Sequence, residues 1–110
     1  KRSKEWWAQA EAFNAFLLMS ELFPDDPHRY YEKFCAQWNY CMNYLIDHEH
    51  GGWYWGGIDI VPENIHSPKG SIWKCNYHTS RSLINCINRL KTRRAGNTTM
   101  PQIPREKQKR

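Results

Sequence analysis

A tryptophan and a histidine five residues apart are the most informative pair of side chains in the sequence. Trp73 precedes a segment with helical character, and His78 falls in the predicted first turn of that helix. The free N–H groups and partial positive charge at a helix start disfavour the imidazolium ion. A histidine held there is expected to stay neutral near pH 7 and to serve as a base. A capping or core histidine is the alternative that the residues leave open.

A second pair of chemically capable side chains lies near the start of the chain. Trp7 and Glu11 are four residues apart, so they share one face of a helix. The neighbouring Trp6 points to a different face, so that one indole can pack while the other faces a cavity. Tryptophan faces suit sugar rings as well as protein cores. Glu11 is then placed to hydrogen-bond a sugar hydroxyl or to orient a histidine. A packed tryptophan pair with Glu11 on a solvated face is equally compatible.

Other candidate chemistry is weaker. A metal site can be drawn from Cys75 and His78 together with Asp47, His48 or His50. Structural zinc prefers paired motifs, and a single CxxH spacing is weak evidence, so we predict no metal. Neither a phosphate-binding glycine loop nor a GxSxG nucleophile motif is present. We therefore predict no cofactor.

Glycines surround three consecutive aromatic residues in the segment GGWYWGG, residues 51–57. Glycine allows tight turns and close approach of the backbone. We expect packing rather than substrate binding to be the role of this segment.

The net charge of +5 is concentrated at the C-terminal end of the sequence. Residues 92–110 hold six basic and one acidic side chain, whereas residues 1–91 hold ten of each. A nucleic-acid surface needs basic residues gathered on a structured face, so the neutral body argues against this function. Residues 92–110 are polar, basic and predicted to be disordered.

Apolar runs and cysteine placement bear on membrane association and on the cellular compartment. No apolar run approaches the ~18 residues of a membrane span, and no signal peptide opens the chain. Three of the four cysteines lie in helical patterns, which favours free thiols in a reducing compartment. We predict a cytoplasmic protein with no membrane partner.

Three helices are predicted to position these residues. Residues 5–23 have strong helix propensity and are apolar nearly all round. A second, amphipathic helix is expected to begin near Pro27 and to run to Asp47, and a third covers residues 76–91. Residues 53–61 are predicted to form a short aromatic hairpin or a pair of short extended segments. Three such helices cannot cover one another, so we expect this chain to be one arc of a larger structure.

Three motifs, EWWAQAEA, DHEHGGWYWG and WKCNYH-x-SR, together resemble the N-acylglucosamine 2-epimerase superfamily, and within it the cellobiose (mannobiose) 2-epimerases. They occur in the family order and cover residues 4–91. The resemblance implies a mainly α fold, in which residues 1–91 form the C-terminal arc of an (α/α)6 barrel with three helices and a short aromatic β-hairpin. The remainder of the barrel is then missing from this chain. Asn76 stands where the family usually has proline, and asparagine is still able to start a helix.

The resemblance also implies roles for the four residues singled out above. Trp7 and Trp73 would stack on a sugar, and Glu11 would belong to the polar lining around its reducing end. His78 would be one of two histidines that exchange the proton at C2 through a cis-enediolate, without metal or cofactor. The second base would lie in an earlier helix outside this chain, so the isolated chain is expected to be inactive.

The predicted function is C2 epimerisation at the reducing end of a small-molecule disaccharide such as cellobiose or mannobiose. Alternatives within the family are N-acylglucosamine 2-epimerase and mannose isomerase-type activity. A non-catalytic sugar-binding α-hairpin module is the alternative from another class. A glycosidase-like barrel would need two carboxylates facing the cleft, and Glu11 is the one good candidate in the sequence.

Overall fold

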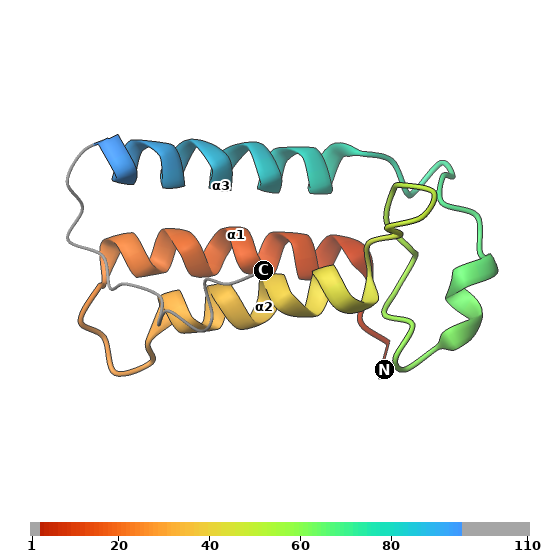
Figure 1. The fold of residues 1–110 in the computed structure, drawn as a ribbon, viewed down its shortest axis with the longest axis horizontal. Helices are drawn as coiled ribbons and strands as arrows, with labels where there is room; N and C mark the ends of the chain where they lie inside the picture. Colours follow the sequence, from red (N-terminus) through yellow and green to blue (C-terminus); the bar gives the residue numbers. More distant parts are fainter. Residues whose placement is uncertain (1–2, 96–110) are drawn as a thin grey trace.

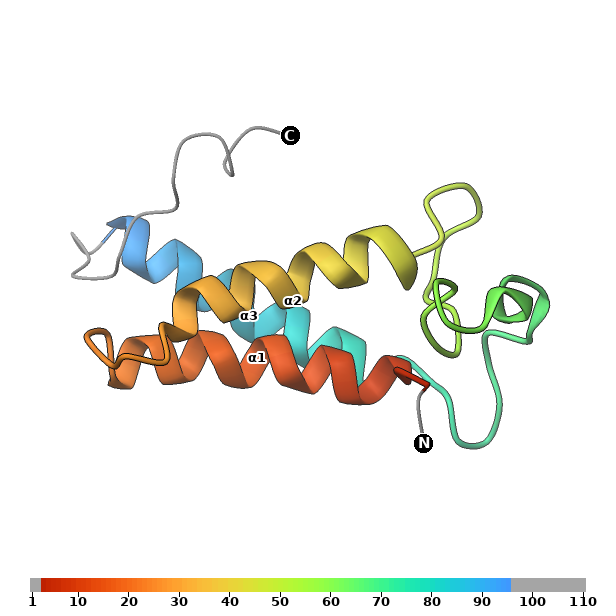
Figure 2. The ribbon, with the colours of Figure 1, turned by 90° about the horizontal axis from the view of Figure 1, so that it is seen from below.

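The computed structural model describes residues 3–95 and is mainly helical. Its elements are α1 (Trp6–Leu22), α2 (Tyr30–Tyr44), the 3-10 helix η1 (Pro62–His66) and α3 (Tyr77–Ala95). Helix α1 packs against both α2 and α3, and the long connection between α2 and α3 gathers at one end of the helices (Figures 1 and 2). None of these helices is long and apolar enough to cross a membrane.

Helix α1 supplies the centre of the core. Its buried residues recur every three or four positions and so form one stripe along the helix: Trp6, Ala10, Phe13, Leu17 and Ser20. The ring of Phe13 lies 5.3 Å from that of Trp38 and 6.3 Å from that of Trp53, measured between centroids. Aromatic packing therefore fixes how α1 is rotated about its axis.

Helix α2 begins three residues later than the sequence pattern predicted. The carboxylate of Asp26 accepts a hydrogen bond of 2.8 Å from the backbone N–H of His28, and Arg29 adopts a left-handed conformation with φ 53°. These contacts make a separate turn around Pro27, and the helix starts at Tyr30. The amphipathic pattern itself is confirmed, because Phe34, Cys41 and Leu45 are buried.

The predicted hairpin over residues 53–61 is wrong. Within residues 3–95 the sheet-like pairing consists of two isolated bridges, Glu5 with Gly56 and Ile46 with Trp53. The N–H of Tyr54 donates to the carbonyl of Leu45 at 2.8 Å, and the N–H of Trp6 donates to Trp55 at 2.9 Å. The backbone groups of Tyr54 and Trp55 thus bond to the ends of α2 and α1, and not to a second strand of a hairpin.

Three glycines in this segment are required by the backbone conformation or by packing. Gly51 and Gly52 adopt φ of 83° and 80°, which favours glycine. A Cβ atom on Gly57 would lie 1.9 Å from the hydroxyl oxygen of Tyr40. The structural part expected for these glycines is therefore confirmed.

Helix α3 begins where the sequence predicts but runs further. The carbonyl of Asn76 accepts the N–H of Ser80 at 2.8 Å, which is the first bond of the helix. The helix continues to Ala95, past the predicted tail boundary at Lys91, and residues 96–110 of that tail lie outside the described residues. In this last turn the guanidinium of Arg93 lies 5.2 Å from the ring centroid of Tyr31, and it also contacts Glu21 of α1.

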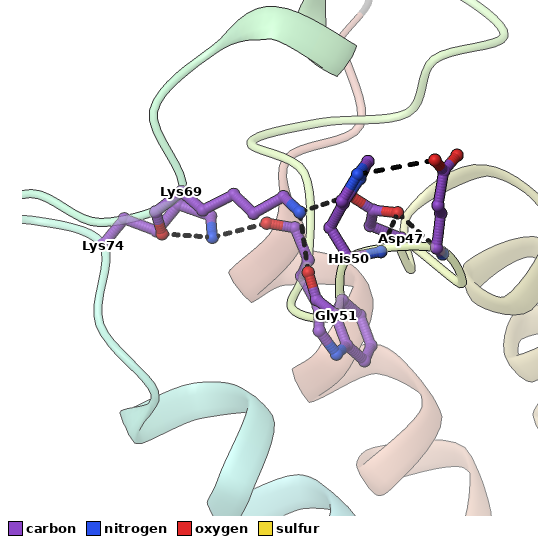
Figure 3. A network of polar contacts seen from close by, with 7 residues as sticks. Asp47, His50, Gly51, Lys69 and Lys74 are labelled. Atoms are coloured by element: carbon purple, nitrogen blue, oxygen red, sulfur yellow. Dashed lines mark hydrogen bonds and ion pairs between the residues drawn. The ribbon is translucent and has the colours of Figure 1, made fainter.

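A network of polar contacts joins two parts of the connection between α2 and α3 (Figure 3). Asp47 accepts hydrogen bonds of 2.9 Å from the backbone N–H groups of Glu49 and His50 and pairs with the ammonium of Lys69. Lys69 also donates to the carbonyl of Gly51 at 2.6 Å. The Lys69 ammonium and the two N–H groups outweigh desolvation and hold the pKa of Asp47 well below its usual value.

The same network includes a buried lysine. The ammonium of Lys74 donates to the carbonyls of Trp53 at 2.7 Å and of Lys69 at 2.8 Å (Figure 3). Lys74 is 5% exposed, and its ammonium lies 5.4 Å from the ring centroid of Trp6. Burial lowers the pKa of Lys74, and the nearby charge of Lys69 lowers it further. We call Asp47, Lys69, Lys74 and the carbonyls that they bind the loop network.

The first prediction concerns Asp47→Asn. The amide keeps the size of the side chain but removes the charge that pairs with Lys69, so the melting temperature should fall by several degrees at pH 7. The folded-state pKa of Asp47 is lowered, so the stabilisation is present above the unfolded pKa of about 4 and is lost as the pH falls below it. The difference between wild type and variant should therefore shrink below about pH 4.

Thermal unfolding from pH 3 to pH 7 measures this difference. The matched control is Asp25→Asn, at an exposed aspartate in the turn after α1. Equal melting temperatures for Asp47→Asn and wild type at pH 7 would show that the charge of Asp47 adds no stability.

Candidate active site

His78 is the second residue of α3, as the sequence predicted, and its side chain meets α1. Its Nδ1 atom lies 2.9 Å from Oε2 of Glu11. Both side chains are partly buried, with exposed fractions of 32% for His78 and 28% for Glu11. Two residues 67 positions apart in sequence are thus brought into direct contact. Of the two functions suggested for Glu11, the structure shows the contact that orients a histidine.

Arg81 completes this contact and was missed in the sequence analysis. Its guanidinium pairs with the same Oε2 atom of Glu11 and donates to the hydroxyl of Tyr77 at 2.7 Å. It also lies 4.7 Å from the centroid of the Tyr77 ring. Arg81 follows His78 by three residues, so the two lie on one face of the helix. That spacing was the signal available in the sequence.

The charges of this cluster favour an ionised carboxylate. Desolvation opposes ionisation of Glu11, but hydrogen bonds from His78 and Arg81 outweigh it and place its pKa below the usual value. The hydrogen bond to Glu11 raises the pKa of Arg81. An ionised carboxylate can accept hydrogen bonds but cannot donate them. Nδ1 of His78 is therefore the donor in this contact, and Nε2 is the nitrogen left to exchange a proton.

Both predicted sugar-stacking tryptophans lie beside this histidine. Trp7 and His78 have ring centroids 5.7 Å apart, tilted by 42°. An open pocket of about 360 Å³ is lined by Trp7, Trp73, His78, Trp55, Trp6 and Glu5. We call it the aromatic pocket. Trp7 is 43% exposed and Trp73 is 76% exposed, so both indoles offer surface to a ligand.

The structure therefore brings together all four predicted site residues, though not in equivalent places. Trp7, Trp73 and His78 line the aromatic pocket, and Glu11 contacts the histidine without lining the pocket. Trp55 was assigned a packing role by its glycine-rich context. It packs on Trp6 with centroids 4.8 Å apart, and it also lines the pocket. Indole faces beside an oriented imidazole suit a sugar ring and proton transfer to or from it.

The alternative metal site finds no support in the arrangement of residues 3–95. No three histidine, cysteine, aspartate or glutamate side chains of this part of the chain are close enough together to hold a metal ion.

Comparison with known proteins identifies relatives of most of this chain. The family model for N-acylglucosamine 2-epimerase (GlcNAc 2-epimerase) matches residues 1–81. A D-mannose isomerase of Marinomonas mediterranea is 34% identical over 92 residues, which cover 81% of this chain and 21% of that protein. A cellobiose 2-epimerase of Bacteroides fragilis is 29% identical over 82 residues, covering 74% of this chain and 20% of that protein. The chain thus spans about a fifth of the length of the curated relatives it matches.

Solved structures of similar proteins agree with this result. The cellobiose 2-epimerase of Spirochaeta thermophila is 37% identical with a TM-score of 0.66, covering 83% of this chain and 22% of that one. A sugar epimerase from a ruminal bacterium is 30% identical with a TM-score of 0.69, covering 81% and 23%. The predicted fold class, a mainly α arc of an α/α barrel, is confirmed. The resemblance seen in the three sequence motifs is confirmed as well, and the chain belongs to the N-acylglucosamine 2-epimerase family.

Proposed function

We propose that this chain is the part of a sugar 2-epimerase that carries one of its two proton-transfer bases. The observation that supports the proposal most directly is the 2.9 Å contact between Nδ1 of His78 and Glu11, next to the exposed indoles of Trp7 and Trp73. Because Nδ1 faces Glu11, Nε2 points away from it and is the nitrogen that acts as the base. The indoles supply the flat apolar surface on which a sugar ring packs.

The proposed reaction starts from the open-chain form of the reducing-end sugar. Nε2 of His78 exchanges a proton with C2, which is acidic because it stands beside the aldehyde. When the C–H bond breaks, its electron pair forms the C1–C2 double bond of a cis-enediolate, and the aldehyde oxygen takes the negative charge. Return of a proton to the opposite face of C2 gives the epimer and needs a second base. Return to C1 instead would give the ketose, which is the isomerase outcome.

Glu11 and Arg81 assist His78 in this proposal. Glu11 holds the Nδ1 proton, and its negative charge stabilises the imidazolium that forms when Nε2 accepts the C2 proton. Arg81 keeps Glu11 ionised and fixes the carboxylate relative to α3. Positioning of this kind matters because a base has to lie within hydrogen-bond reach of the proton that it removes.

A reducing disaccharide such as cellobiose or mannobiose is the substrate we favour. The support is the 37% identity to the Spirochaeta thermophila cellobiose 2-epimerase and the recurrence of that activity among the curated relatives. Free mannose is the second candidate, because the D-mannose isomerase of Marinomonas mediterranea is 34% identical. Turnover of both sugars by the complete protein, with product analysis for epimer and ketose, separates the two.

The second prediction is that the isolated 110-residue chain forms no epimer from cellobiose. One base can remove the C2 proton, but inversion needs a proton delivered to the other face. Incubation with cellobiose followed by chromatography of the epimeric disaccharide tests this, with the complete protein as positive control. Epimer formed by the isolated chain faster than in buffer would contradict the two-base proposal.

The third prediction concerns His78→Asn in the complete protein. Turnover should fall by at least ~10²-fold, the lower end for loss of a general base, while sugar affinity and melting temperature are kept. A capping histidine would leave turnover nearly unchanged, because asparagine also caps helices. A purely core histidine would instead lower the melting temperature and keep activity per folded molecule.

Turnover, sugar affinity and thermal stability measured on the same preparation distinguish these outcomes. His66→Asn, at an exposed histidine that ends η1, is the matched control and should leave all three unchanged. Full turnover in His78→Asn would rule out the catalytic role of this histidine.

The fourth prediction concerns Glu11→Gln. The glutamine amide can donate to Nδ1, which places the imidazole proton on Nε2 and removes the free base, so turnover should fall at least ~10-fold. The pKa of Glu11 is lowered in the folded protein, so the carboxylate stays ionised above the ordinary glutamate value of about 4.3 and becomes protonated only below its own, lower pKa. The ratio of wild-type to variant turnover should therefore be constant near neutral pH and narrow in acid.

A pH–rate profile of both proteins measures that ratio, and Glu32→Gln, on the exposed face of α2, is the control. Equal profiles for Glu11→Gln and wild type would remove Glu11 from the proposed mechanism.

A further inference from the structure

Trp73 lines the aromatic pocket from a segment without regular secondary structure. Its indole is 76% exposed and the preceding Ile72 is 89% exposed, whereas the following Lys74 is 5% exposed. The exposed fraction therefore falls sharply between the two consecutive residues Trp73 and Lys74. Since the indole itself makes few contacts with the body of the protein, its place in the pocket depends on how the backbone on either side is held.

A tight turn sets the local conformation at Trp73. The hydroxyl of Ser71 accepts the backbone N–H groups of Trp73 at 3.1 Å and of Lys74 at 3.0 Å. The N–H of Ser71 donates back to the carbonyl of Lys74 at 3.0 Å. These bonds lie within residues 71–74, so they shape the turn but do not attach it to the rest of the pocket.

Lys74 makes that attachment. Its ammonium donates to the carbonyl of Trp53, two residues before Trp55 (Figure 3). It also lies 5.4 Å from the ring centroid of Trp6. Trp6 and Trp55 are both walls of the aromatic pocket. The third contact is with the carbonyl of Lys69, at the other end of the same loop. One side chain thus joins the loop that carries Trp73 to two other elements that line the pocket.

Burial of an ammonium is unusual and needs a reason. Lysine is almost never fully buried without partners, and removing an ammonium from water is costly. Here the partners are two neutral carbonyls and an indole face. An apolar side chain would fill the same space without the cost of desolvation, but it could not bond the two carbonyls.

We propose that Lys74 is a positioning residue, which fastens the Trp73 loop to the aromatic pocket and thereby sets sugar affinity without touching the sugar. The inference rests on the proposed function in one respect, namely that Trp73 stacks on the substrate. The placement of Trp73 by Lys74 does not depend on it.

The test uses Lys74→Met in the complete protein. Methionine keeps an unbranched side chain in the buried position but leaves the carbonyls of Trp53 and Lys69 without their donor. Loss of such a partner corresponds to roughly a tenfold change in an equilibrium constant. We expect KM for cellobiose to rise about 10-fold and kcat to stay within about 2-fold, because His78 and Glu11 are unchanged.

The position of the Trp73 indole is measured separately from activity, by ¹⁹F NMR of protein labelled with 5-fluorotryptophan. The resonance of Trp73 is assigned as the one lost in Trp73→Phe. We expect it to shift or broaden in Lys74→Met. Lys33→Met, which removes the same charge from the exposed face of α2, is the matched control and should change neither the resonance nor KM.

Ser71→Ala serves as a milder variant if Lys74→Met fails to fold. It removes the hydroxyl that holds the N–H groups of Trp73 and Lys74, so KM should rise in the same direction by a smaller factor. The inference is overturned if the folded variants keep both the Trp73 resonance and KM of the wild type. It is equally overturned if kcat falls while KM and the resonance stay unchanged. If the complete protein turns over no sugar, the proposed function fails, and the resonance alone decides the role of Lys74: a shift supports it and constancy overturns it.

Discussion

The rotation of α1 about its own axis is the constraint on which the rest of the structure depends. One stripe of this helix, running from Ala10 through Phe13 to Leu17, is buried in the core. Glu11 is one residue from Ala10 and therefore points about 100° away, to the side where α3 presents His78 and Arg81. A small rotation of α1 would lose the aromatic core contacts and the carboxylate contact together. Core packing and the site are thus fixed by the same helix orientation.

The second half of the site depends on buried backbone groups rather than on helix packing. Residues 45–76 contain no long helix or paired strands, and their backbone groups are satisfied by helix ends and by side chains of the loop network. Such a segment can hold a defined shape because its polar groups are bonded, although few apolar residues anchor it. Helix α3 begins at Tyr77, directly after this segment. The position of His78 is set by its contact with Glu11 of α1.

The sequence allowed the helices and the composition of the site to be predicted, because both depend on local pattern. Helical periodicity placed α1 to within a residue and His78 in the first turn of α3. The hairpin prediction failed because alternation of aromatic residues indicates extended backbone but not the partner that pairs with it. The start of α2 was missed because the Asp26 side chain stabilises a turn that proline propensity alone does not distinguish from a helix start. Family membership came from three motifs and not from any one of them.

Arg81, Trp55 and Lys74 show why the remainder of the site was out of reach. The contact of Arg81 with Glu11 spans 70 positions, and Trp55 acts both in packing and in lining the pocket. Lysine is ordinarily a surface residue, so nothing in the pattern around Lys74 indicates that its ammonium is buried. Burial has a chemical consequence, since amine-reactive reagents can reach this nitrogen when the loop network opens and not before. The rate at which Lys74 acquires such a label, compared with that of exposed lysines, is then a direct measure of how often this wall of the pocket comes apart in the native protein.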